Sequence, residues 1–199
     1  MLDFVISMFG SRTVEWIAAA CGLMNVALIV RRSVWNYPFG FAMVVLYFFI
    51  FRDYRLYSDA ALQVYYFAIQ TYGVWYWLQG QADDGRVVVV PLARSRFAGY
   101  LAITGALWLV IAALMARYTD AAAPYQDAAV AALSVLAQFL LSRRNQESWL
   151  VWIAVDLLAI ELFFSRGLMP TAALYVIFLA LAITGWFQWR KAPRQEQSV

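Results

Sequence analysis

Histidine is absent from this chain, and cysteine occurs once, at Cys21. The lack of histidine excludes His-ligated metal sites, histidine general bases and axial haem histidines. A single cysteine allows neither an intrachain disulfide nor a metal cluster held by thiolates. We therefore expect no metal and no other cofactor, and any function has to use carboxylates, amides, hydroxyls and aromatic rings.

Charged side chains are also scarce. They make up 14% of the 199 residues, whereas 64% are hydrophobic and the mean hydropathy is +0.66. About a quarter of the residues of a soluble domain are charged. The net charge of +3 does not indicate nucleic-acid binding, because the basic residues flank apolar runs as they do in membrane proteins. The composition predicts an all-α integral membrane protein, in which helices satisfy every backbone polar group within lipid.

Seven apolar runs approach the length that crosses a bilayer, about 20 residues. The expected spans are 14–30, 34–51, 59–78, 97–116, 125–142, 149–165 and 170–189. The longest polar stretch, 79–96, lies between the third and fourth spans. We expect the short apolar run inside it, 87–90, to pack on the membrane surface.

The basic residues predict which way the chain is oriented. With seven spans, ten Lys and Arg residues fall on the side of the C-terminus and five on the other. The first group is Arg31, Arg32, Arg86, Arg94, Arg96, Arg143, Arg144, Arg190, Lys191 and Arg194, and the second is Arg12, Arg52, Arg55, Arg117 and Arg166. Because loops rich in Lys and Arg stay in the cytoplasm, we expect a cytoplasmic C-terminus.

The sequence contains an internal repeat. Residues 14–77 align without gaps with 126–189, and 16 of the 64 positions are identical. The matches include Arg31 and Arg32 with Arg143 and Arg144, and Gly73 and Trp77 with Gly185 and Trp189. Shared apolar composition does not explain matches between these residue types.

The repeat predicts an architecture. A first three-helix repeat, 12–78, and a second, 125–190, are separated by a linker helix, 97–116. Because the linker adds one crossing, both repeats face the same way, and a rotation near 180° about the membrane normal should superpose them. In transporters built from such 3+1+3 parallel repeats, the substrate binds near mid-membrane between the repeats.

Polar side chains share one face of the third span at helical spacing: Asp59, Gln63, Tyr66, Gln70, Gly73 and Trp77. The matching face of the seventh span holds Thr171, Tyr175, Phe178, Ala182, Gly185 and Trp189. Amides do not face lipid tails, so the first face lines a substrate path or hydrogen-bonds neighbouring helices. Both readings stay open for Gln63 and Gln70. For Gly73 and Gly185 we favour a role in close helix packing.

A carboxylate lies deep in the sixth span. Asp156 follows Trp149 and Trp152 at spacings of three and four residues. It could face a cationic substrate, relay a proton or bond a neighbouring helix, and such a residue suggests a functional site by default. Glu161 is expected to be an interfacial carboxylate. Gln138 and Asn36 add polar groups from the fifth and second spans.

Tryptophan is abundant, with nine residues. Trp75, Trp77, Trp186 and Trp189 cluster at the ends of the third and seventh spans. They could belong to the aromatic belt at the membrane interface. Alternatively, they form a box that stacks on a flat heteroaromatic ring, with cation–π attraction if the ring is positively charged.

Several of these motifs together resemble the PnuC family of vitamin transporters. The motifs are NYPFG at 36–40, YSDAALQ at 57–63, GVWYW at 73–77, ESWLVWIAVD at 147–156, TAALY at 171–175 and GWFQW at 185–189. The resemblance covers about residues 12–191. It implies a SWEET-like seven-helix fold in a bacterial-type inner membrane. It also implies uptake of nicotinamide riboside by facilitated diffusion, with the substrate trapped by cytosolic phosphorylation.

The resemblance leaves the substrate open. Relatives are assigned to thiamine, riboflavin or deoxynucleosides, and thiamine also has a flat cationic ring. The best-known members form homotrimers. The residues that we expect to bind substrate are Asn36, Gln63, Tyr66, Gln70, Trp77, Gln138, Trp152, Asp156, Tyr175, Trp186 and Trp189.

Two other classes of membrane protein fit the sequence poorly. A retinal photoreceptor needs a lysine inside its last helix, but the one lysine, Lys191, lies beyond the seventh span. An intramembrane enzyme would need catalytic side chains that converge at helical spacing, and no such pair is present, so we expect no enzyme. Transport coupled to protons through Asp156 remains an alternative mechanism.

Overall fold

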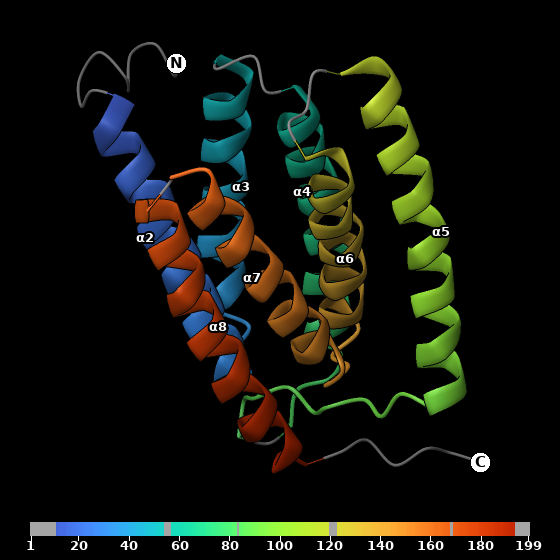
Figure 1. Cartoon of the computed structure of the whole chain (residues 1–199). Helices are drawn as coiled ribbons and strands as arrows, with labels where there is room; N and C mark the ends of the chain where they lie inside the picture. Colours follow the sequence, from blue (N-terminus) through green and yellow to red (C-terminus); the bar gives the residue numbers. More distant parts are fainter. Residues whose placement is uncertain (1–10, 54–56, 83, 120–122, 168, 194–199) are drawn as a thin grey trace. The chain divides into compact units, whose positions relative to one another are not determined.

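Seven α-helices account for most of the computed structural model, which describes residues 11–53, 57–82, 84–119, 123–167 and 169–193 (Figure 1). They are α2 (Ser11–Val30), α3 (Asn36–Asp53), α4 (Tyr57–Leu78), α5 (Arg94–Tyr118), α6 (Pro124–Ser142), α7 (Ser148–Ser165) and α8 (Met169–Arg190). Each expected span falls on one of these helices, in order. Within the described ranges, β-structure is limited to two isolated bridges, Gln81 with Val87 and Val90 with Asn145.

Five of the helices, as far as they are described, are long and apolar enough to cross a bilayer. These are the segments Thr13–Val30, Arg94–Tyr118, Pro124–Ser142, Ser148–Ser165 and Thr171–Arg190. Polar residues lower the mean hydropathy of the other two helices: Asn36, Arg52 and Asp53 in α3, and the amides and tyrosines in α4. Asn36 of α3 and the two glutamines of α4 are among the residues that we expect to bind substrate.

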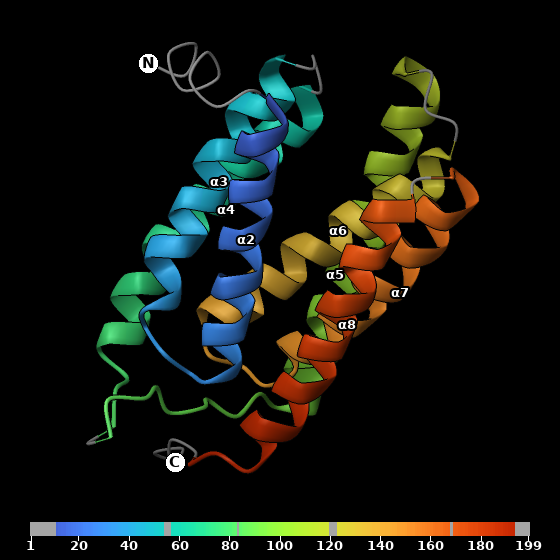
Figure 2. The same cartoon turned by 90° about the vertical axis from the view of Figure 1, so that its left-hand side faces the viewer.

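The chain divides between Val87 and Val88 into two compact units. In the first unit, α3 packs between α2 and α4 (Figure 2). In the second unit, α6 packs against α5 and α7, and α7 packs against α8. Consecutive helices within each unit run in opposite directions (Figure 1). The residues that we expect to bind substrate fall in both units.

The alignment of the two repeats also relates the helix bounds of the two units. Helices α3 and α7 begin at Asn36 and Ser148, which occupy the same position of the repeat, and so do Tyr57 and Met169, which begin α4 and α8. Proline supports some of the helix starts, because the first turn does not use its missing N–H. Pro124 opens α6, and Pro38 lies in the first turn of α3.

Helices α2 and α6 end in the same hydrogen-bonded motif. The N–H groups of Arg32 and Ser33 donate to the carbonyls of Ile29 and Leu28 at 2.8 and 3.0 Å. In α6 the corresponding bonds join Arg144 to Leu141 and Asn145 to Leu140, at 2.9 and 3.0 Å. This is a Schellman motif, in which the residue with positive φ is usually glycine. Here it is an arginine both times.

The 87–90 segment is more enclosed by the protein than we expect of a run that packs on the membrane surface. Val87 and Val89 are buried within the protein. Val87 N–H donates to Arg32 O, and Val90 N–H donates to Arg144 O, both at 3.0 Å. Val89 N–H donates to the carbonyl of Pro193, beyond the end of α8. Because its backbone groups find protein partners, the segment can be buried away from water.

Candidate functional site

Four amide side chains are buried in the first unit. Asn25 of α2, Asn36 of α3, and Gln63 and Gln70 of α4 are all buried. Asn25 Nδ2 donates to Asn36 O at 2.9 Å, and Asn36 Nδ2 donates to Ser33 O at 2.7 Å. These bonds join α2 to the start of α3 and fix two of the amides. Four amides from three helices give this unit a polar interior.

Gly40 of α3 lies against two of these amides, Gln70 and Asn25. A Cβ atom at this position would overlap Gln70 Oε1 and lie 2.7 Å from Asn25 Nδ2. Glycine is therefore required here for the two amides to approach the backbone of α3 this closely. Gln70 is 5% exposed, and its Oε1 atom accepts no hydrogen bond from the described residues. A buried carbonyl oxygen without a donor is costly, so an explanation for it is needed.

Each unit contains a right-angled pair of buried aromatic rings. Tyr37 and Trp77 have ring centroids 5.5 Å apart at 86°, and Trp149 and Trp189 have centroids 5.6 Å apart at 85°. The two partners of the second pair occupy the same positions of the repeat as those of the first. Edge-to-face packing of this kind is favourable between aromatic rings. The repeat therefore extends from helix bounds to side-chain geometry.

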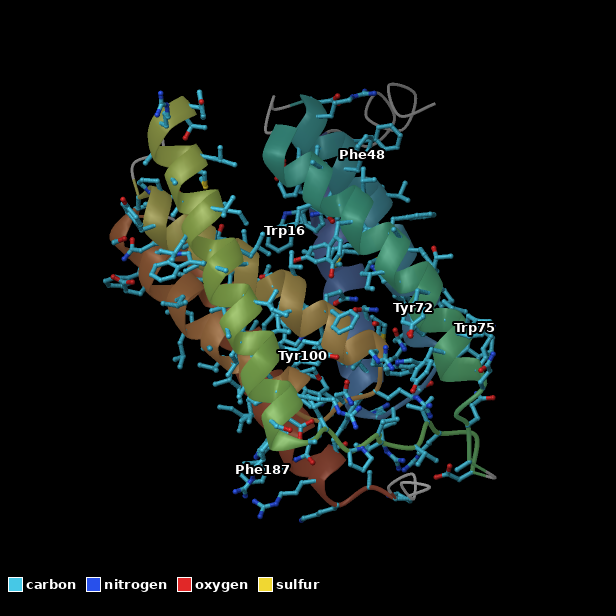
Figure 3. The ribbon with its side chains drawn as sticks, turned by 90° about the vertical axis from the view of Figure 1, so that its right-hand side faces the viewer. Trp16, Phe48, Tyr72, Trp75, Tyr100 and Phe187 are labelled. Atoms are coloured by element: carbon cyan, nitrogen blue, oxygen red, sulfur yellow. The ribbon has the colours of Figure 1, made fainter. Side chains whose placement is uncertain are left out.

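Burial separates the clustered tryptophans. Trp77 is 1% exposed and Trp189 is fully buried, so neither of these two belongs to a lipid-facing belt. Trp75 is 57% exposed and lies near the C-terminal end of α4 beside Tyr72 (Figure 3). Trp186 is half-buried. Burial therefore argues against the aromatic belt for Trp77 and Trp189, and stacking of these two rings on a substrate stays a prediction.

Gly185 of α8 makes room for the indole of Trp149. A Cβ atom there would lie 2.5 Å from Trp149 Cε2. This confirms the expectation that Gly185 permits close helix packing. The indole Nε1 of Trp149 is buried and donates to no acceptor in the described part of the chain.

The sixth expected span, α7, carries Asp156 and Trp152 on neighbouring turns. Asp156 is 3% exposed, and it makes no hydrogen bond or ion pair with the described residues. Trp152 is half-buried and packs against a core of Leu136, Ala137, Leu140 and Val151. Glu161 is exposed and accepts a hydrogen bond from Gln126 Nε2 at 3.2 Å, which fits an interfacial carboxylate.

The chain matches the family model described as nicotinamide mononucleotide transporter over residues 12–191. It belongs to this family. Its members are transporters and not enzymes, so the chain is a multi-pass, all-helical membrane transport protein. A buried carboxylate and buried amides in spanning helices are the residue types expected along a transport path.

Named relatives align along nearly the whole chain. The nicotinamide riboside transporter PnuC of Escherichia coli is 25% identical, with 95% of this chain and 91% of that protein covered. The riboflavin/roseoflavin transporter RibM of Streptomyces davaonensis is 29% identical, with 88% and 83% covered. The crystal structure of the vitamin B3 transporter PnuC matches with a TM-score of 0.77 at 23% identity, over 95% of this chain and 85% of that one. This structural match supports the transporter fold.

The other residues that we expect to bind substrate are less buried. Tyr66, Gln138 and Tyr175 are half-buried. Tyr66 lies beside Tyr65, and Tyr175 stacks on Phe163 with centroids 5.3 Å apart. The side chain of Asp59 lies outside the described residues. In each unit, only some of the residues that we expect to bind substrate are therefore fully buried.

Sequence reasoning missed four residues that pack among the buried amides and the paired aromatic rings. They are Asn25, Tyr37, Gly40 and Trp149, none of which was counted among the expected substrate-binding residues. A signal existed for Asn25, since an amide within an apolar span is unusual. The signal for Tyr37 and Trp149 was their common position in the repeat. Gly40 gave no signal, because its role depends on which side chains pack against it.

Proposed function

We propose that this protein carries nicotinamide riboside across a membrane by facilitated diffusion, with the substrate trapped by cytosolic phosphorylation. The observation that carries the proposal is the family match, together with a near full-length likeness to a relative named as a nicotinamide riboside transporter. The buried groups offer chemistry that suits this ligand. Indoles can stack on a flat ring, amides can bond ribose hydroxyls, and one carboxylate can balance a pyridinium charge.

Riboflavin is the second candidate substrate, because a relative of similar likeness is named as a riboflavin transporter. The two vitamins differ in charge. Nicotinamide riboside is a cation, whereas riboflavin is neutral, so a buried carboxylate such as Asp156 favours the riboside. Thiamine, which also has a flat cationic ring, is a third ligand to test.

Binding to the purified protein tests the proposal directly. Nicotinamide riboside, riboflavin and thiamine are titrated in parallel and followed by calorimetry, with tryptophan fluorescence as a second signal. We expect the riboside to bind most tightly and to equilibrate across proteoliposomes without a driving ion gradient. Preferential binding of another vitamin would replace the substrate, and the absence of binding by all three would overturn the proposal.

We further propose that the protein resides in a bacterial-type inner membrane with its C-terminus in the cytoplasm, as a homotrimer. The surplus of Lys and Arg on the side of the C-terminus supports the orientation. A C-terminal reporter that is active only in the cytoplasm tests it. Light scattering in detergent tests the trimer, and a monomer of 22.7 kDa would contradict it.

A further inference from the structure

The Gln70 amide packs against Gly40 in the first unit, and no described residue donates a hydrogen bond to its oxygen. The absence of a side chain at Gly40 leaves room for Gln70 Oε1, and Asn25 Nδ2 lies beside the same position. Asn25 Nδ2 is already bonded to Asn36 O at 2.9 Å. Gln70 Oε1 remains without a donor from the described residues. Within a membrane protein, water does not readily supply the missing partner.

The second unit fills the corresponding place differently. In the alignment of the two repeats, Trp152 stands opposite Gly40, and Ala182 stands opposite Gln70. A large side chain on α7 and a small one on α8 thus replace a small residue on α3 and a long amide on α4. Glycine at position 40 is not dictated by the helix pair itself, since the matching helix pair accommodates tryptophan there.

We propose that Gly40 is a specificity-determining position, which holds Gln70 so that its Oε1 accepts a hydrogen bond from a donor on the substrate. This inference rests on the proposed function and deepens it. A buried acceptor discriminates against ligands that lack the donor, because such a ligand leaves the acceptor unpaired. The oxygen is covered in this structure, so the substrate reaches it when the helices part during transport.

The substrate class that follows carries an uncharged N–H or O–H donor. In nicotinamide riboside we assign this donor to the carboxamide N–H or to the ribose 2′-hydroxyl. Two analogues separate these two groups. 3-Acetylpyridine riboside replaces the carboxamide with a methyl ketone of similar shape and has no N–H, and the 2′-deoxyriboside lacks one hydroxyl.

The positional role of Gly40 is tested with Gly40→Ala and a matched control, Gly105→Ala. Both are glycines within helices, but a Cβ at Gly105 meets nothing within 4 Å. At Gly40 the atoms to be displaced are the ends of two flexible side chains, so we expect the variant to fold. Gly40→Ala should weaken binding of nicotinamide riboside about tenfold, the loss expected from one hydrogen bond. Gly105→Ala should bind as the wild type does.

Gln70→Met provides the second test, because methionine keeps the length of the side chain and removes the amide. One of the two analogues should bind the wild type about tenfold less tightly than the riboside does. The same analogue and the riboside should bind Gln70→Met with nearly equal affinity. This comparison holds even if Gly40→Ala fails to fold.

The outcomes distinguish this inference from the proposed function. If the wild type binds none of the three vitamins, the proposed function fails and the inference falls with it. If the wild type binds a vitamin and both Gly40→Ala and Gln70→Met bind it equally well, the inference alone is overturned. The inference is also overturned if each analogue binds less tightly than the riboside by the same factor in the wild type and in Gln70→Met. Gln70 would then not recognise the donor that the analogue lacks.

Discussion

Arg32 and Arg144 occupy the same place at the ends of α2 and α6, and both adopt a left-handed backbone, with φ of 58° and 61°. An L-residue pays about 1 kcal/mol or more for this conformation, which glycine adopts freely. Both side chains have a use that glycine could not provide. Arg32 Nη1 donates to Val87 O at 2.9 Å, and Arg144 Nη1 donates to Val88 O at 3.2 Å.

The two arginine side chains therefore donate hydrogen bonds to consecutive carbonyls of the segment that connects the units. Burial lowers the pKa of the Arg32 guanidinium from its ordinary value, because the charged group loses hydration. The hydrogen bond to Val87 O replaces part of that hydration. Asn145 Nδ2 adds a bond to Val90 O at 3.0 Å. The side-chain hydrogen bonds of Arg32 and Arg144 to this irregular segment offset the free-energy cost of their left-handed backbone.

Removing the Arg32 side chain should destabilise the protein through this segment. Arg32→Ala should lower the free energy of unfolding by about 1–3 kcal/mol, because Val87 O loses its donor. Arg32→Gly should lose less, since glycine relieves the left-handed backbone. Thermal unfolding in detergent measures the order. Arg31→Ala, at the exposed neighbour, is the control, with a change of at most about 0.5 kcal/mol. Equal effects at both positions would contradict the hydrogen-bonding role.

The close packing of the Trp149 indole against Gly185 gives a second prediction. Gly185→Ala places a methyl group within the van der Waals radius of a rigid indole, so Trp149 or α8 has to move. We expect a loss of about 1–3 kcal/mol, as for other overpacked cores. Gly99→Ala in α5 is the control, because a Cβ there meets nothing within 4 Å. Replacing glycine in that helix should be neutral or slightly stabilising. Equal stability of Gly185→Ala and Gly99→Ala would contradict the close packing of Trp149 against Gly185.

Neighbouring tryptophans of α4 should respond differently to truncation. Trp77 is enclosed and packs on Tyr37, whereas Trp75 is largely exposed. Trp77→Ala should cost about 3–5 kcal/mol, the range seen for buried aromatic residues. Trp75→Ala should leave the stability in detergent nearly unchanged. Chemical denaturation followed by circular dichroism makes the comparison, and similar losses in both variants would show that Trp77 is not a core residue.

The seven helices could be predicted from sequence because the apolar runs and the repeat are visible in residue order. The helix bounds differ from the expected spans by a few residues. The second span, for example, is expected at 34–51 and is helix α3 (Asn36–Asp53). The rotation that relates the two repeats remains a prediction. The burial of Val87 and Val89 could not be predicted, because it accompanies hydrogen bonds between this segment and Arg32 and Arg144. In the sequence these two arginines appear only as charged residues of loops.

The candidate site was less predictable than the fold. Helical spacing placed Gln63, Gln70 and Trp77 on one face, and the structure buries all three. Spacing within one helix says nothing about the partner helix, however. The closeness of Gln70 to Gly40, and the bond from Asn25 to Asn36, arise from packing between helices. Substrate binding by all of these residues stays a prediction that the experiments above address.

The buried carboxylate of α7 separates facilitated diffusion from proton coupling. Under the proposed mechanism, uptake of nicotinamide riboside into proteoliposomes should be the same with and without a proton gradient, in the wild type and in Asp156→Asn. If Asp156 balances the pyridinium charge, Asp156→Asn should weaken riboside binding about tenfold, or about 1.4 kcal/mol, and leave binding of neutral riboflavin unchanged. Glu161→Gln is the control, because this carboxylate on the same helix is exposed and already bonded to Gln126. Uptake that the gradient drives in the wild type but not in Asp156→Asn would instead make Asp156 the proton carrier, because an asparagine can neither gain nor lose the proton.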